Sequence, residues 1–82
     1  MEFKLPPGYI KTEVDSSQIK WIAHDKNQRC FVCFKKDGSV WSYDEIDIEE
    51  FWEFNDAESV GKYFHANIKN KPAEKIHDGK NS

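Results

Sequence analysis

The amino-acid sequence predicts an α+β domain, with a three-stranded antiparallel β-meander and two C-terminal helices packed on one of its faces. Asp37-Gly38 lies between two runs of aromatic and β-branched residues, and this dipeptide is a strong β-hairpin signal. Farther along, one helical face is indicated by the i, i+3, i+4, i+7 and i+8 spacing of Val60, Tyr63, Phe64, Asn67 and Ile68. The chain has 82 residues and 15% aromatic residues, which suits one small domain with a compact core.

The first segment, residues 1–13, is expected to be an extended N-terminal arm. Pro6-Pro7-Gly8 cannot continue a helix and favours a turn. The arm carries apolar side chains on both sides of this turn. We therefore place it along an edge of the sheet or on the face that the helices leave open.

Three strands are expected over residues 19–24, 30–34 and 40–43, because these runs are rich in aromatic and β-branched residues and are separated by turn signals. A loop centred on Lys26-Asn27 sets Trp21 opposite Val32, and a two-residue loop at Asp37-Gly38 sets Phe34 opposite Trp41. With this register, one face of the meander forms the floor for the helices and carries Ile19, Trp21, Ala23, Cys30, Val32, Phe34, Trp41 and Tyr43.

The first helix is expected to begin at a capping box. Asp47 is the N-cap and Glu50 the N3 residue, an arrangement that satisfies free backbone N–H groups at a helix start. Ile48, Phe51 and Trp52 then line one side of this helix.

The second helix carries the apolar stripe and cannot extend past Pro72. Residues 70–82 are polar and rich in lysine, so they are expected to form a flexible tail. The folded domain is accordingly assigned to residues 14–69.

The charges are unevenly distributed along the chain. The net charge is −3, yet residues 44–58 hold eight carboxylates and no basic residue, while the rest holds twelve Lys and Arg against seven Asp and Glu. This acidic segment is either a solvated helix face or a contact for another protein; a calcium site is disfavoured because the alternating ligand loop is missing. The candidate acidic contact patch consists of Asp44, Glu45, Glu49, Glu50 and Glu53.

No catalytic or metal site is expected, and no cofactor. Cys30 and Cys33 have the spacing of redox and zinc sites, but in a strand they point to opposite faces. The three histidines are dispersed and the four glycines isolated, so neither a catalytic pair nor a phosphate loop is indicated. The chain has no signal-peptide pattern and no membrane-spanning run, so the expected compartment is the cytoplasm.

Several short motifs between residues 14 and 69, taken together, resemble the KTSC-domain family, whose members occur alone in bacterial and phage proteins and at the C-terminus of some lysyl-tRNA synthetases. The motifs are Ser16-Ser17-Gln18-Ile19, Ile22 with Asp25, Val32 with Phe34, Gly38 with Trp41-Ser42-Tyr43, and Ser59-Val60-Gly61-Lys62-Tyr63-Phe64 with Asn67-Ile68-Lys69.

The resemblance implies a fold and suggests RNA binding. It also bears on the first strand, because Trp21 and Ala23 stand where small residues are usual. That expectation implies an alternative register with a bulge, in which Ile22 and His24 point into the core and Trp21 points outward.

We expect a non-enzymatic binding module that acts through a protein partner, with weak RNA binding as a further property. The alternatives are an inhibitor or adaptor, such as phages use against their hosts, that contacts its target through the acidic segment, and a structural domain that forms homodimers. Contacts to nucleic acid or to a partner are assigned to Lys20, Trp21, Phe31, Lys35, Lys62 and Lys69.

Overall fold

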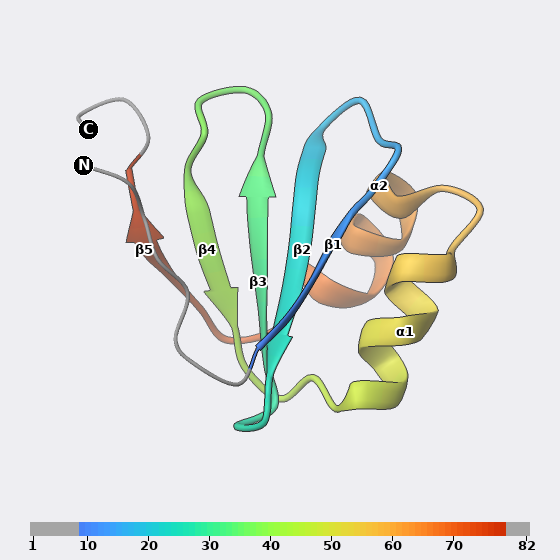
Figure 1. Ribbon diagram of the computed structural model, residues 1–82, viewed down its shortest axis with the longest axis vertical. Coiled ribbons are helices and arrows are strands. Elements are labelled where there is room, and N and C mark those ends of the chain that lie inside the picture. The colour runs from blue at the N-terminus through green and yellow to red at the C-terminus, as the bar shows by residue number, and fades with distance from the viewer. Residues whose placement is uncertain (1–8, 79–82) are drawn as a thin grey trace.

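The structure is a computed structural model that describes residues 9–78, in which a five-stranded antiparallel sheet carries a short helical layer on one side (Figure 1). The strands follow one another across the sheet in sequence order, and the helices lie beside β1 and β2 with β5 at the far edge. The elements are β1 (Ile10–Glu13), β2 (Ile19–Asp25), β3 (Arg29–Phe34), β4 (Val40–Tyr43), α1 (Ile48–Asp56), α2 (Val60–Tyr63), the π-helix η1 (Phe64–Ile68) and β5 (Ala73–His77).

The domain is α+β, but the expected three-stranded meander is wrong because both edges of the sheet carry one more strand. Part of the N-terminal arm forms β1, which pairs with β2 from Ile10↔His24 to Glu13↔Trp21. Residues 73–77, which the sequence placed in a flexible tail, form β5 against β4. An edge strand needs backbone pairing more than apolar side chains, so its sequence signal is weak. Residues 1–8 of the arm and 79–82 of the tail lie outside the described residues.

The register of β2 on β3 differs by one residue from the expectation, which placed Trp21 opposite Val32. The structure pairs Ile22 with Val32 and Trp21 with Cys33, and a bulge interrupts the ladder between Ile19 and Trp21. The turn contains three residues rather than two, because Gln28 adopts the left-handed conformation with φ 62°. A one-residue shift moves side chains to the other face. The alternative register that the family resemblance implied is therefore confirmed.

The β3–β4 hairpin differs by two residues from the expected register, which leaves the faces unchanged. Trp41 pairs with Val32 instead of Phe34. The loop has four residues, since the N–H of Phe34 donates to the carbonyl of Ser39 at 2.9 Å, and Gly38 takes φ 74°. Asp37 Oδ1 accepts from the backbone N–H of Ser39 at 2.9 Å and from its hydroxyl at 2.7 Å, which fixes the turn.

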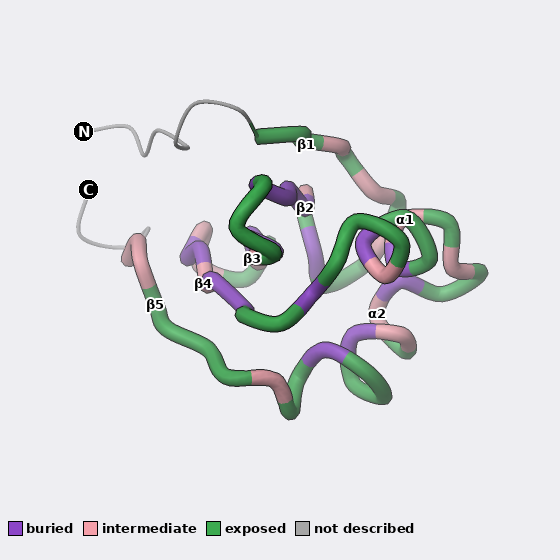
Figure 2. The backbone as a smooth tube through the Cα atoms, turned by 90° about the horizontal axis from the view of Figure 1, so that it is seen from below, coloured by how far each residue is buried: buried purple, intermediate pink, exposed green. Residues whose placement is uncertain are grey.

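Buried residues are most frequent in β2, β3 and β4 (Figure 2). Their side chains form two clusters, one on each face of the sheet. Cys30 belongs to the cluster under the helices and Cys33 to the cluster on the other face, so the two thiols point apart as expected. The larger cluster contains Ile19, Ile22, Cys30, Val32, Tyr43, Ile46, Phe51, Phe54, Val60, Phe64 and Ile68. The smaller contains Ala23, Phe31, Cys33 and Val40.

The sequence predicted correctly where α1 starts, but it did not predict correctly which side of α1 is buried. Asp47 Oδ1 accepts from the N–H of Glu50 at 2.8 Å, which confirms the N-cap. Phe51 and Phe54 are the buried residues of this helix, whereas Ile48 and Trp52, expected beside Phe51, are exposed. No helix in the described part of the chain has the length and apolar run that a bilayer crossing requires.

The stability of the domain is expected to fall above pH 9.0, and more steeply above pH 10.0, because of two groups that face each other across β3 and β4, Cys30 and Tyr43. Burial, together with the nearby Cys30, raises the pKa of Tyr43 from 10.0 to about 12, and burial also raises the pKa of the Cys30 thiol. Both groups ionise first in the unfolded chain, so from the unfolded pKa upward the unfolded state binds fewer protons than the folded state. The free energy of unfolding then decreases by about 1.4 kcal/mol per pH unit for each group.

Urea unfolding followed across this pH range tests the expectation. Tyr43→Phe removes one of the two groups, so its stability should decline less steeply above pH 10 than that of the parent. An equal slope in both proteins would show that Tyr43 does not contribute.

Candidate protein-binding surface

The residues assigned to nucleic acid do not form one surface in this structure. Phe31 is only 3% exposed, and Trp21 is half-buried with Lys11 Nζ 4.8 Å from its ring centroid. Both aromatic side chains pack in the cluster on the sheet face away from the helices, whereas Lys62 and Lys69 belong to the helical layer. The sheet therefore separates the aromatic residues from two of the lysines.

Lys20 and Lys35 lie near the beginning of β2, and both are exposed. The N–H of Lys35 donates to the carbonyl of Gln18 at 2.9 Å, and the Gln18 side chain lies 3.3 Å from His65 Nε2 on η1. Gln18 thus links Lys35 to the helical layer, in which Lys62 and Lys69 also lie.

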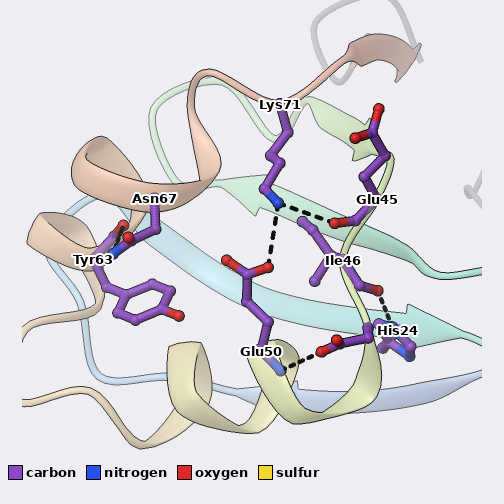
Figure 3. Close-up of polar contacts among 8 residues, drawn as sticks. His24, Glu45, Ile46, Glu50, Tyr63, Asn67 and Lys71 are labelled. Atoms are coloured by element: carbon purple, nitrogen blue, oxygen red, sulfur yellow. Dashed lines mark hydrogen bonds and ion pairs between the residues drawn. The ribbon is translucent and has the colours of Figure 1, made fainter.

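One member of the acidic patch is used to hold the fold together. Glu50 Oε1 pairs with Lys71 Nζ at 3.4 Å, and the same ammonium donates to the carbonyl of Glu45 at 3.0 Å (Figure 3). The N–H of Asp44 donates to the carbonyl of Pro72 at 2.8 Å, next to β5. These contacts attach the segment that enters β5 to α1 and to the loop before it. Glu49 and Glu53 remain exposed on α1.

Large apolar side chains are also exposed on α1 and on β1. Ile48 and Trp52 on α1 are 41% and 40% exposed, and Ile10 on β1 is 41% exposed. Ile48 and Trp52 lie one helical turn apart, as do Glu49 and Glu53. We define the α1 surface as Ile10, Ile48, Glu49, Trp52 and Glu53.

A cleft of about 380 Å³ opens between the starts of β1 and α1, and Ile10 and Ile48 stand on its two sides. Thr12 Oγ1 donates to Asn55 Oδ1 at 2.8 Å and ties β1 to α1. We call this the β1–α1 cleft; it is lined by Ile10, His24, Asp25, Lys26, Gln28, Asp47 and Ile48.

Two residues that line the cleft, His24 and Asp25, are buried polar residues of β2. His24 Nε2 lies 2.6 Å from the carbonyl of Ile46, and its ring centroid is 5.3 Å from that of Phe51. Asp25 Oδ1 accepts from the N–H groups of Asn27 and Arg29 at 3.0 and 3.2 Å, and its Oδ2 pairs with Arg29 Nη2 at 3.1 Å. Asp25 thereby organises the β2–β3 turn that forms one end of the cleft.

Comparison with known proteins places this architecture in a family. The family model of the KTSC domain matches residues 15–71, which is most of the chain. The chain belongs to the KTSC domain family. It is also similar to the crystal structure of the KTSC domain protein YPO2434 from Yersinia pestis, with 27% identity, a TM-score of 0.77, and coverage of 84% of this chain and 99% of that one. No curated protein matches it significantly.

Two motifs of this KTSC domain have direct structural roles. Ser16 Oγ accepts from the N–H groups of Gln18 and Ile19 at 3.2 and 3.3 Å and so shapes the entry to β2. Ser59 Oγ accepts from the N–H of Lys62 at 3.3 Å and caps α2. These hydrogen bonds indicate that the serines of both motifs contribute to folding.

The sequence of this KTSC domain did not predict two features of the site. These are the exposure of Ile48 and Trp52 and the presence of the β1–α1 cleft. A signal for the exposure existed, because Phe51 and Phe54 form an i, i+3 pair that can define the buried side of α1. The cleft had no such signal, since it depends on where β1 docks.

Proposed function

We propose that this KTSC domain is a non-enzymatic binding module that contacts a basic partner protein through the α1 surface. The observation that carries the proposal is the coincidence of exposed apolar and acidic side chains on one helix: Ile48 and Trp52 beside Glu49 and Glu53. Exposed apolar groups rimmed by charges are typical of protein contacts, and tryptophan is enriched among residues that dominate binding energy.

The charge of the α1 surface indicates the kind of partner. Carboxylates on α1 attract a basic protein and accelerate its association, an effect that decreases with salt. The same carboxylates repel a polyanion. A nucleic-acid role has less support, because Trp21 and Phe31 lie on the face opposite Lys62 and Lys69 and Phe31 is buried.

Affinity capture from extracts of the source cell tests the proposal, with nuclease added to remove nucleic acid. The parent should retain a basic protein whose binding weakens as salt increases. Trp52→Ala should weaken that binding about 30-fold if this side chain is a dominant contact. Glu49→Lys combined with Glu53→Lys should abolish it.

The matched control carries the same change in net charge at residues that are not part of the α1 surface. Glu13→Lys combined with Glu74→Lys reverses two exposed acids on β1 and β5 and should bind as the parent does. Retention of the partner by the Glu49/Glu53 variant, or its loss on nuclease treatment, would contradict the proposal. Gel filtration of the purified protein identifies the alternative in which the partner is a second copy of the chain.

A further inference from the structure

We propose that the partner protein binds through an extended segment, which adds to the outer edge of β1 as a further strand of the sheet, alongside α1. This inference rests on the proposed function and specifies how the partner reaches the α1 surface. Strand β1 forms one margin of the sheet (Figure 2). Within residues 9–78 it pairs with β2 on one side, and no described strand pairs with its other side. Backbone N–H and C=O groups on such an edge can pair with an extended segment of another chain.

The side of α1 that faces β1 carries exposed apolar side chains. Ile48, Trp52 and Asn55 follow one another at i, i+4 and i+7, so they share one side of the helix. Asn55 Oδ1 accepts from the hydroxyl of Thr12 at 2.8 Å, which orients this side of α1 towards β1. At the other end of the helix, Ile48 and Ile10 line the same cleft. We define the α1 stripe as Ile48, Trp52 and Asn55, and these two contacts place it along β1.

The pairing of β1 with β2 shows which of its side chains share a side with the α1 stripe. Ile10 pairs with His24 and Thr12 with Ile22. The His24 ring lies 5.3 Å from that of Phe51 on α1, and Ile22 belongs to the cluster under the helices. Directly paired residues point to the same face, so Ile10 and Thr12 also point to the helical side. In a strand added beside β1, every second side chain points to this side and packs against the α1 stripe.

These surroundings select a segment in which apolar residues alternate with hydrophilic ones. Side chains on the helical side meet the exposed surfaces of Ile10, Ile48 and Trp52. The intervening side chains lie on the opposite face, with those of Lys11 and Glu13, whose charges are opposite. Hydrophilic residues suit that face, and lysine or arginine there keeps the segment basic, as the carboxylates of α1 favour. Lys11 and Glu13 contribute backbone groups, not side chains, to the proposed contact.

The opposite edge of the sheet does not offer the same combination. Strand β5 forms that edge, whereas the helices lie beside β1 and β2 (Figure 1). The large apolar residues that are exposed in the described part of the chain lie on α1 and at the start of β1, and none lies on β5. A segment added to β5 therefore gains backbone hydrogen bonds but no apolar contact. We accordingly assign the partner to the β1 edge.

The experiment uses a synthetic peptide as the probe, so it does not depend on identifying the partner. The probe is acetyl-Lys-Val-Lys-Val-Lys-Val-amide, titrated into isotope-labelled protein and followed by NMR. It should bind with a Kd on the order of 0.1–1 mM, as expected for a short segment, and shift the amide signals of β1 and the indole signal of Trp52. A peptide with three lysines followed by three valines has the same composition without the alternation, and it should bind about tenfold more weakly.

Two N-methylated forms of the probe test for backbone pairing. In an added strand the N–H groups of alternate residues point towards β1, and those of the residues between them point away. Methylation of the valine nitrogens and methylation of the lysine nitrogens should therefore have unequal effects. One form should bind about tenfold more weakly than the probe, and the other should bind as the probe does. Equal binding of the two forms would overturn the inference, because contacts through side chains alone do not distinguish them.

Protein variants locate the site. Trp52→Ala removes an apolar contact and should weaken probe binding about tenfold. Lys75→Ala changes an exposed residue of β5 and should bind the probe as the parent does. Unchanged binding in Trp52→Ala, or shifts centred on β5, would contradict strand addition at β1.

Other occupants of the edge and a failure of the proposed function give different results. A dimer in gel filtration that the probe dissociates would assign the β1 edge to a second copy of the chain and overturn the inference. Capture of a basic partner by a protein that does not bind the probe would contradict strand addition and leave the proposed function in place. Probe binding at β1 without partner capture would sustain the site and contradict the proposed function.

Discussion

Replacing Phe64 by alanine is expected to lower the free energy of unfolding by about 3–5 kcal/mol, a large share of what so small a domain possesses. The Phe64 side chain is 6% exposed and stands edge-on to the rings of Phe34 and Tyr43, with both centroids 5.5 Å away. Its removal leaves a cavity between the helical layer and the sheet and eliminates both aromatic contacts.

Denaturant and thermal unfolding measure the effect, which corresponds to a fall in Tm of at least about 12 °C in a domain of this size. Lys69→Ala is the control, since Lys69 directly follows η1 and is exposed. If Phe64→Ala melted within a degree or two of the parent, Phe64 would not connect the two layers.

Asp25→Ala is expected to destabilise the domain by about 2–4 kcal/mol. The Asp25 carboxylate accepts two backbone N–H groups and pairs with Arg29, and all three contacts close the β2–β3 turn. The substitution leaves these donors without their acceptor. Because the Arg29 side chain is 41% exposed, water can solvate its charge, which places the cost below that of a fully buried pair.

In the same unfolding experiment, Asp25→Asn separates the contribution of the hydrogen bonds from that of the negative charge. An asparagine keeps an oxygen at the position of Oδ1 but lacks the negative charge, so its stability should lie between those of the parent and Asp25→Ala. Equal destabilisation by both substitutions would assign the effect to charge alone. A neutral Asp25→Ala would show that the turn closes without this side chain.

The elements with local signals were predictable from the sequence. The capping box at Asp47 and Glu50 is a short-range pattern, and the structure contains its hydrogen bond. Burial of Val60, Phe64 and Ile68 was also predicted, because a helix that covers a sheet must bury one side. Asn67 of the same predicted stripe is exposed, and residues 64–68 form a π-helix instead of continuing the α-helix. In these cases a few neighbouring residues determine the conformation.

The remaining features leave little trace in the sequence. The β2 register follows from the left-handed Gln28, a conformation that its residue type does not indicate. In β5, Ile76 is the one large apolar residue, so pairing with β4 leaves little trace in the sequence. For the candidate site, the acidic residues of α1 were predicted, whereas Ile10 joins the surface only because β1 docks beside the helix.

The long connection that precedes β5 affects the order in which the strands form and the ease with which two molecules exchange this strand. Strands β1 to β4 are linked by short connections, but β5 pairs with β4 only after residues 44–72, with both helices, have closed into a loop. This strand is therefore expected to form last and to open first. Opening bares the edge of β4, against which the β5 of a second molecule can pair in an exchanged dimer. Lys71, bound to Glu50 and Glu45 just before β5, holds the hinge that resists this exchange.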